Sequence, residues 1–263
     1  MIALVRDVSP LLASCELTFL ERAAIDVGRA CAQHAAYCDA LREAGAEVEF
    51  MAAAPEMADG VFVEDTAIVL DEVAVITRPG SPSRRAEIMT AASALASLRP
   101  LSFIREPGTI DGGDVLRVGR DLFVGITART NRDGFDQLSA LAGRFGYRTT
   151  AVGVRGCLHL KTAVTALDDE SVVMHEGHVD RRVFERYRVI DADAAEPEGA
   201  NVVRVSGRVL ASASAPRTCE RLTRAGHQTI AIDISEMEKA EAGLTCLSLL
   251  LPRGARTSRQ SLA

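Results

Sequence analysis

The sequence predicts an α/β fold in which one structural unit is repeated around a ring. Short apolar runs with the alternation of β-strands come in pairs, and a helical stretch follows most of the pairs. These units recur at a spacing of roughly 40 to 50 residues, which is typical of a repeat architecture. The two ends of the chain supply the parts of one further unit. A ring closed in this way leaves few sheet edges exposed.

Each predicted pair of strands is joined by a short polar or glycine-containing turn, as in β-hairpins. In chain order the pairs are 65–70 with 73–78, 114–117 with 122–126, 161–167 with 172–174, and 202–205 with 209–213. The helical pattern that follows predicts helices at 84–98, 134–145 and 217–226, the last leading into a strand at 227–232.

The fifth unit is closed by the two termini. Strands are expected at 246–251 and 2–5, followed by a helix at 21–44 that ends at Gly45 and by a strand at 47–51. The polar segment 192–199 is loop-like, but it is too short to separate two domains. We therefore expect one catalytic domain that spans residues 1–263.

Composition excludes several classes of function. The 263 residues carry a formal net charge of -6, no Trp and few aromatic side chains, whereas nucleic-acid binding needs a basic face or stacking platforms. No apolar run is long enough to span a membrane, and the N-terminus has no signal-peptide pattern. We expect no nucleic-acid partner and no membrane partner, and the balance suits a cationic small molecule.

The cysteines are scattered and form no CxxC pair, which argues against a zinc site and fits a reduced, cytoplasmic protein. The pair His175 and His178 has no nearby Cys or cluster of carboxylates that would complete a metal site. We therefore expect no metal and no other cofactor. The six cysteines are Cys15, Cys31, Cys38, Cys157, Cys219 and Cys246.

Three residue types in separate units are the parts of an activated thiol nucleophile. Cys246 lies on an apolar run near the C-terminus, His159 lies in a strand-like segment, and Asp111 precedes Gly112 and Gly113. Each falls at or just before the start of an inner strand, and equivalent positions of a ring gather around its axis. The alternatives are a buried strand cysteine, a core histidine and a turn-capping aspartate, and Cys157 is a rival nucleophile beside His159.

Charged residues near the same positions indicate a ligand with two charged ends. Glu64 and Asp65 are adjacent acids between apolar strands, suited to gripping a cation unless they are solvated strand ends. Arg84 and Arg129 follow equivalent strands of successive units. Each of them is a surface arginine, or it holds a carboxylate through its guanidinium fork. Together these residues describe an arginine-like ligand.

At these residues the chain resembles the dimethylarginine dimethylaminohydrolases, a family of the guanidine-modifying pentein superfamily. The matching motifs occur in the family's order and cover nearly the whole chain. They are Val61-Phe62-Val63-Glu64-Asp65, Ile76-Thr77-Arg78-Pro79-Gly80, Pro82-Ser83-Arg84-Arg85, Ile110-Asp111-Gly112-Gly113-Asp114-Val115, Phe123-Val124-Gly125, Arg129-Thr130-Asn131, Leu158-His159-Leu160-Lys161 and Leu244-Thr245-Cys246.

The resemblance implies a five-bladed α/β propeller, the pentein fold, with repeated ββαβ units around a pseudo-fivefold axis. It implies hydrolysis of asymmetric dimethylarginine and monomethylarginine to citrulline and dimethylamine or methylamine, through a covalent thiouronium intermediate on cysteine. By motif match Cys246 is the nucleophile, His159 the general acid and base, and Asp111 the residue that orients His159.

The same resemblance implies the residues that bind the substrate. Asp65 with Glu64 is the expected clamp on the guanidinium, in the motif that also contains Phe62, and Arg84 and Arg129 are the expected carboxylate binders. The α-amine is expected at Asp59 and at the backbone near Leu17 and Ala240. The acid before the final loop, Glu241, is a position at which family members differ.

Other functions remain as alternatives: an arginine deiminase, an agmatine hydrolase, an amidinotransferase, or a silent methylarginine-binding protein. Arg84 and Arg129 favour a substrate with a carboxylate, which counts against agmatine. The partner expected is a small molecule, with the protein itself a monomer or a homodimer.

Overall fold

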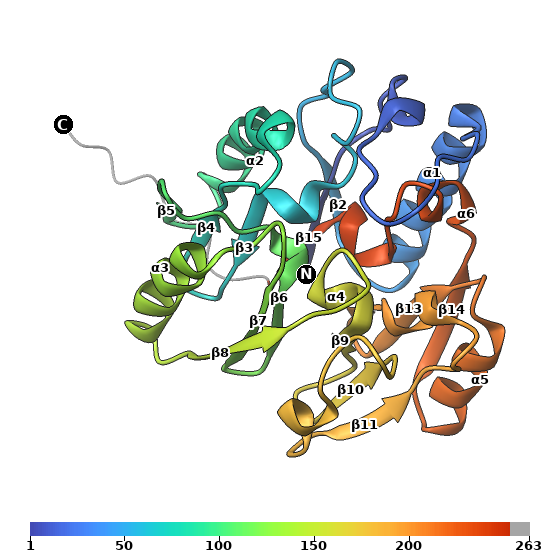
Figure 1. Cartoon of the computed structure of the whole chain (residues 1–263). Coiled ribbons are helices and arrows are strands. Elements are labelled where there is room, and N and C mark those ends of the chain that lie inside the picture. The colour runs from blue at the N-terminus through green and yellow to red at the C-terminus, as the bar shows by residue number, and fades with distance from the viewer. Residues whose placement is uncertain (253–263) are drawn as a thin grey trace.

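The computed structural model describes residues 1–252, so that the last part of the expected domain, 253–263, lies outside the described residues. Within them the strands form five three-stranded sheets arranged around a common axis, with helices outside (Figure 1). The prediction of a five-bladed α/β propeller is confirmed.

Each sheet has the same topology. The inner strand pairs antiparallel with the middle strand, and the middle strand pairs parallel with the outer strand. From the axis outward the sheets are β3 (Ala67–Val69), β4 (Ala74–Ile76) and β5 (Leu101–Phe103); β6 (Val115–Val118), β7 (Asp121–Ile126) and β8 (Arg148–Gly153); β9 (Val164–Ala166), β10 (Ser171–Met174) and β11 (Arg188–Asp191); β12 (Val203–Val205), β13 (Arg208–Ser212) and β14 (Gln228–Ile232); and β15 (Leu249–Leu251), β1 (Ile2–Val5) and β2 (Glu47–Phe50).

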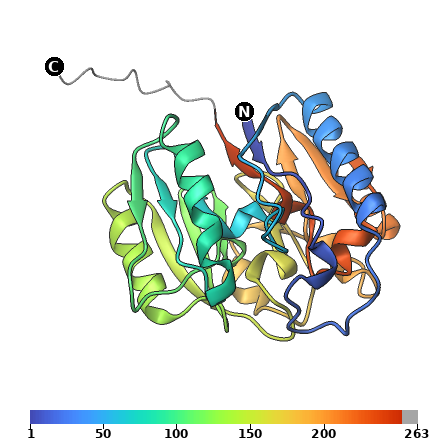
Figure 2. The same ribbon diagram turned by 90° about the horizontal axis from the view of Figure 1, so that it is seen from above.

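The last sheet closes the ring with strands from both ends of the chain. Leu4 pairs with Leu249 in the antiparallel register of β1 and β15, which lie side by side in Figure 2. The inner strands of all five sheets line a central channel of about 350 Å³. This closure agrees with the sequence prediction that the termini complete the fifth unit.

Helices cover the outer faces of the sheets and bury apolar residues against them. The longer ones are α1 (Val27–Glu43), α2 (Ile88–Leu95), α3 (Arg132–Gly143) and α5 (Pro216–Arg224), and two single turns are α4 (Leu160–Ala163) and α6 (Ser235–Glu238). In α3, for example, Phe135 and Leu138 pack against Leu122 and Val124 of β7. None of the helices in the described part of the chain is both long and apolar enough to cross a membrane.

Two predicted helices differ from the structure at their N-terminal ends. The helix predicted from residue 21 begins at Val27, because the side chain of Asp26 caps it by accepting the Arg29 amide at 3.0 Å. The helix predicted at 84–98 is a 3₁₀ turn, Pro82–Glu87, that continues into α2. Gly45 follows α1 with a φ of 95°, a conformation that favours glycine.

The inner strands are shorter than predicted, because their first residues form helical turns. The residues predicted to start strands at 65, 161 and 246 lie instead in the 3₁₀ turn Val63–Thr66, in α4 and in the 3₁₀ turn Leu244–Leu247. Side-chain bonds hold such turns: Thr66 donates to the Val63 carbonyl at 2.6 Å, and Thr77 donates to the Asp65 carbonyl at 2.5 Å.

Candidate active site

Five equivalent turns meet at one end of the axis, one before each inner strand: Val63–Thr66, Gly112–Asp114, α4, Pro197–Ala200 and Leu244–Leu247. Asp65 and Cys246 lie within two of them, and Asp111 and His159 immediately precede two others. Asp65, His159 and Cys246 line one small pocket. The expectation that the ring brings these distant residues together is confirmed.

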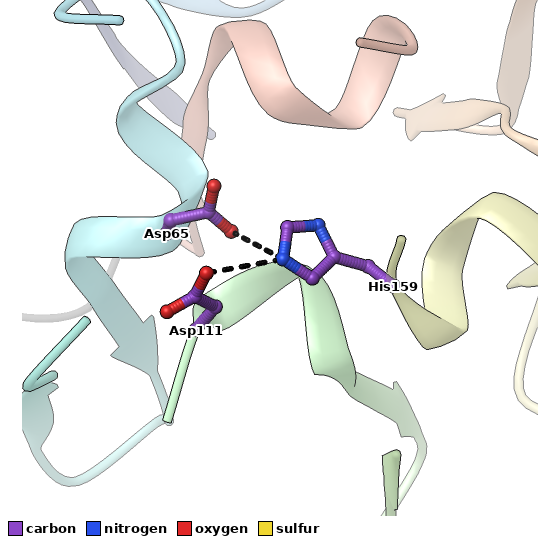
Figure 3. Close-up of side chains that lie close together, drawn as sticks. All are labelled: Asp65, Asp111 and His159. Atoms are coloured by element: carbon purple, nitrogen blue, oxygen red, sulfur yellow. Dashed lines mark hydrogen bonds and ion pairs between the residues drawn. The ribbon is translucent and has the colours of Figure 1, made fainter. Parts of the chain in front are cut away.

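His159 lies at the N-terminus of α4 in an extended conformation, and not inside a strand as the sequence suggested. Its Nε2 atom is 3.1 Å from Asp111 Oδ2 and 3.9 Å from Asp65 Oδ1. Figure 3 shows both carboxylates directed at the same ring nitrogen. Burial alone would lower the pKa of His159, but the carboxylates of Asp65, Asp111 and Asp114 outweigh it and raise the pKa to about 9. At neutral pH the ring is therefore an imidazolium.

Backbone amides fix the two carboxylates that face His159. Asp111 Oδ1 accepts the Gly80 amide at 2.8 Å, and Asp65 Oδ1 accepts the Gly113 amide at 2.9 Å. Position 113 has no room for a side chain, because a Cβ there would lie 2.6 Å from the Nδ1 atom of His159. The glycine thus allows the imidazole ring to approach the backbone closely.

Asp114 stabilises the turn α4, which His159 precedes, although no role was assigned to Asp114 from the sequence. Its Oδ1 accepts the Leu160 amide at 3.0 Å, and its Oδ2 accepts the hydroxyls of Thr127 and Thr130, each at 2.7 Å. Burial raises the pKa of Asp114 to about 6. Its place in the motif that contains Asp111 was the only signal for it in the sequence.

Cys246 lies in the turn Leu244–Leu247, where its sulfur accepts the Gly243 amide at 3.5 Å. Burial raises the pKa of this thiol, and the negative charges of Glu64 and Asp65 raise it further. The rival Cys157 does not line the pocket of His159; it lies in a neighbouring cavity and donates to the His159 carbonyl at 3.5 Å. Burial raises the pKa of Cys157 to about 12.

The two predicted carboxylate-binding arginines have different surroundings. The guanidinium of Arg84 is buried, bonds to both Asp65 and Glu87, and donates to the Phe62 carbonyl at 2.9 Å. Arg129 Nη2 lies 3.3 Å from Glu16 Oε2 and Nη1 lies 3.8 Å from Asp111 Oδ2. Both arginines line the pocket, and Phe62 is another of its walls.

Glu16 also lines the pocket, and sequence reasoning missed it. Its carboxylate accepts the hydroxyl of Ser81 at 2.7 Å and that of Ser83, and its amide donates to the carboxylate of Asp59, 3.2 Å from Oδ2. No spacing or periodicity in the sequence links Glu16 to Arg129. Only the folded loop brings the two residues together.

Residues predicted near the α-amine surround this loop. Of these, Asp59 and Ala240 line the pocket, whereas Leu17 packs against the core beside it; Glu241, predicted as a variable position of the family, also lines the pocket. Glu241 adopts a φ of 59° and accepts the Thr18 amide at 2.9 Å, together with the next two amides along the chain. Its carboxylate therefore holds the loop in place.

Glu64 is a predicted site residue that does not line the pocket, as are Leu17 and Asp111, although Asp111 contacts His159. Glu64 Oε2 accepts the Thr245 hydroxyl at 2.7 Å, and its Oε1 lies 2.5 Å from Lys161 Nζ. It lines the central channel on the other side of these turns. Asn201 joins the same network: it accepts the Thr245 amide at 3.0 Å and donates to the Lys161 carbonyl at 2.9 Å.

A group of three or more His, Cys, Asp or Glu side chains placed closely enough to hold a metal ion exists in the described residues only where His159, Asp65 and Asp111 meet, with one atom of each within 4.8 Å of the others. The protonated Nε2 of His159 already supplies the positive charge between the carboxylates. His175 and His178 instead bond to backbone carbonyls, at 3.3 Å and 2.8 Å.

Comparison with known proteins identifies the family. The arginine deiminase family model matches residues 53–213. A dimethylarginine dimethylaminohydrolase of Streptomyces coelicolor is 44% identical over 252 residues, which cover 95% of this chain and 96% of that protein. The chain belongs to the dimethylarginine dimethylaminohydrolase family. A member of this family from Pseudomonas aeruginosa is 33% identical, covering 85% of this chain and 89% of that protein.

Solved structures of the family superimpose on the whole propeller. A cysteine-to-serine variant of the Pseudomonas aeruginosa dimethylarginine dimethylaminohydrolase, complexed with citrulline, matches with a TM-score of 0.90 and 31% identity, covering 94% of this chain and 97% of that one. A dimethylarginine dimethylaminohydrolase forming an adduct with S-methyl-L-thiocitrulline also matches with a TM-score of 0.90. The likeness to a cyanobacterial arginine dihydrolase, at 19% identity and a TM-score of 0.81, shows the fold alone.

Proposed function

We propose that this chain hydrolyses N-ω-methylated arginines to citrulline and dimethylamine or methylamine, with Cys246 as nucleophile, His159 as general acid and base, and Asp111 as the residue that orients His159. One observation carries the assignment of roles. An imidazolium held between two carboxylates lines the same small pocket as a cysteine on an equivalent turn of the ring. Family membership supplies the substrate class.

The reaction begins with a thiol that holds its proton in the free protein. The positive guanidinium of the substrate, bound beside Asp65, opposes the negative charges that raise the pKa of Cys246 and so favours the thiolate. The pocket holds the guanidinium carbon against sulfur, which offsets the poor electrophilicity of a delocalised cation. The thiol proton passes to solvent as the substrate binds, and the thiolate sulfur then forms the C–S bond with the guanidinium carbon.

His159 carries both proton transfers that follow. The tetrahedral adduct breaks its bond to the methylated nitrogen, which takes the proton of the imidazolium and departs as an amine. A thiouronium remains on Cys246. Neutral His159 then removes a proton from water as the oxygen attacks the thiouronium carbon. The adduct expels the sulfur of Cys246, which takes up the remaining hydroxyl proton as a thiol, and citrulline is released. Asp111 holds Nε2 throughout, because its bond to His159 favours the charged ring.

Substrate recognition divides between the two charged ends of the amino acid. Asp65 binds the guanidinium, Arg129 with Arg84 attracts the carboxylate, and Asp59 with the backbone near Ala240 and Leu17 binds the α-amine. The carboxylate of Glu16 forms an ion pair with the guanidinium of Arg129, so the carboxylate of the substrate replaces that of Glu16 when it binds. Glu64, paired with Lys161, supports the turns from the channel side instead of touching the substrate.

A second candidate is hydrolysis of free arginine, since the family model that matches is described as arginine deiminase. The remaining parts of the proposal concern the molecule as a whole. We propose that the chain works as a single catalytic domain, as a monomer or homodimer, in the cytoplasm, where its scattered free thiols fit a reducing environment.

Trapping the covalent intermediate tests the proposed roles. Acid quenching of the enzyme during turnover of asymmetric dimethylarginine is expected to leave a fraction with the mass of the substrate less that of dimethylamine added to Cys246, located by peptide mapping. The Cys157→Ser variant should form the same adduct. An adduct on Cys157, or none during active turnover, would refute the assignment of the nucleophile.

A further inference from the structure

A second cavity of about 450 Å³ adjoins the catalytic pocket and is used by no step of the reaction. The two share the side chains of Leu158, Glu241 and Ala242 as walls. The second cavity extends away from Cys246, between the loop tip at Phe19 and Leu20 and the turn Pro197–Ala200. Its volume is within the range of pockets that bind small organic molecules.

The walls of this cavity offer apolar surface to an occupant. Ile234 and Leu244 are buried parts of the core beneath it. Phe19 and Leu20 are 54% and 50% exposed, although both line the cavity. Large apolar side chains left this accessible at a cavity bury more surface when an apolar group fills it.

The charge of the cavity walls has one sign. Three carboxylates line it, those of Glu198, Glu238 and Glu241, and the lining contains neither Lys nor Arg. Its histidine, His178, bonds through Nδ1 to the Arg155 carbonyl. An occupant therefore meets negative charge without a competing protein cation.

Two of the three carboxylates already have hydrogen-bond donors. Glu241 accepts backbone amides of the loop, and Glu238 accepts the hydroxyls of Ser212 and Ser214. The carboxylate of Glu198 has no hydrogen bond or ion pair with any other described residue. Burial raises the pKa of Glu198, and the charges of Glu238 and Glu196 raise it further. A cation placed in the cavity would relieve this unfavourable environment.

We propose that this cavity is a second ligand site, which binds an organic ammonium ion with an apolar body, separately from the methylarginine in the catalytic pocket. The ammonium group is placed at Glu198 and Glu238, and the apolar body lies against Phe19 and Leu20. Because Glu241 forms a wall of both cavities and holds the loop, an occupant also contacts the loop that covers the catalytic pocket.

Calorimetric titration of 2-phenylethylammonium into the full chain, with the catalytic pocket saturated by citrulline, tests the proposal. The probe is expected to bind with citrulline present, and 2-phenylethanol, which has the same body without the charge, is expected to bind at least about fivefold more weakly. Glu198→Gln should weaken binding of the probe by a similar factor. Glu185→Gln, which makes the same charge change at an exposed position, should not.

Several results would overturn the proposal. Displacement of the probe by citrulline would place it in the catalytic pocket, and equal binding of the alcohol would remove the role of charge. Unchanged affinity in Glu198→Gln, or no binding at all to the wild-type chain, would equally refute the site. If Glu198→Gln does not fold by circular dichroism, Glu238→Gln provides the same test. Turnover of methylarginine by either variant, measured separately, keeps this result distinct from the proposed reaction.

Discussion

At the scale of single residues, the protonation of Cys246 and His159 decides how the proposed reaction starts. Three carboxylates raise the pKa of His159 to about 9, and burial with nearby negative charge raises the thiol pKa as well. Both groups therefore hold a proton in the free protein at neutral pH. The proposed reactive state, a thiolate beside an imidazolium, contains one proton fewer than this thiol and imidazolium. The free enzyme must therefore lose a proton before the substrate binds or as it binds.

This loss of a proton predicts different pH profiles for the two kinetic parameters. We expect kcat/KM to rise about tenfold per pH unit and to level off near the His159 pKa of about 9, because it reports the free enzyme. kcat reports the complex, in which the guanidinium lowers the thiol pKa, and should level off at a lower pH. Steady-state rates across the pH range measure both. A kcat/KM that does not change between about pH 6 and 8 would mean that the free thiol is already ionised.

At the scale of elements, the turn Pro197–Ala200 contributes no reactive group, but a positioning residue follows it directly. Asn201 follows the turn Pro197–Ala200, and its side-chain amide bonds to Thr245, the neighbour of Cys246. The amide oxygen of Asn201 accepts the backbone amide of Thr245, and the amide nitrogen donates to the Thr245 hydroxyl. It also donates to the Lys161 carbonyl in α4, the helical turn that His159 precedes. Asn201 thus links the turn of the proposed nucleophile, Cys246, to the turn of the proposed general acid, His159.

Replacing Asn201 should therefore affect the chemical step more than substrate binding. We expect Asn201→Ala to lower kcat by about 10- to 100-fold while KM changes by less than about threefold, because the two reacting groups lose their fixed separation. Gln137→Ala is the matched control, since Gln137 also makes two backbone hydrogen bonds but on the outer helix α3. Equal losses of kcat in both variants, or a rise in KM alone, would contradict this role.

The elements also show what the sequence could and could not predict. The inner and middle strands were predicted because their apolar runs are separated by clear turn signals. The outer strands β5, β8 and β11 were missed by the reading of the residues, since they are short or carry polar exposed side chains such as Arg148. Three of the turns before the inner strands were read as the starts of strands, because their helical path depends on bonds such as that from Thr77 to the Asp65 carbonyl.

The same distinction holds for the site. Cys246, His159 and Asp111 were found because their residue types and their equivalent places in the repeat pointed to one chemistry. Glu16 and Asn201 were missed because their partners are far away in the sequence: Glu16 meets Arg129, and Asn201 meets Thr245. Glu64 was expected beside Asp65 in the pocket, but adjacent side chains of a 3₁₀ turn point in different directions, and Glu64 faces Lys161.

At the scale of the whole molecule, the closure of the ring connects the turn of Cys246, the proposed nucleophile, to the pairing of β1 with β15. β15 follows the turn of Cys246 and pairs with β1. Ser248 lies between the turn Leu244–Leu247 and β15, and its hydroxyl forms a hydrogen bond of 2.8 Å with the hydroxyl of Tyr37 in α1. Because the sheets share apolar contacts around the axis, we expect the five sheets to unfold together.

A substitution in the closing sheet should therefore destabilise the entire protein. Leu4 is buried with Leu249 and Ile76 in a cluster that joins two sheets, and Leu4→Ala is expected to lower the free energy of unfolding by about 3 kcal/mol. Urea unfolding followed by circular dichroism and by residual activity should give one coincident transition, shifted to lower urea. Met89→Ala, at an exposed position of α2, should change the free energy little. Separate transitions for the two signals would show that the ring does not unfold as one unit.

The measurement that tests the central claim most directly is citrulline release from asymmetric dimethylarginine, monomethylarginine, symmetric dimethylarginine and free arginine in parallel, by the wild-type chain and by Cys246→Ser. We expect release from the first two substrates by the wild-type chain and none by the variant, with the circular dichroism spectrum unchanged. Release from free arginine alone would make the protein a deiminase. Undiminished release by Cys246→Ser would contradict the account of the site.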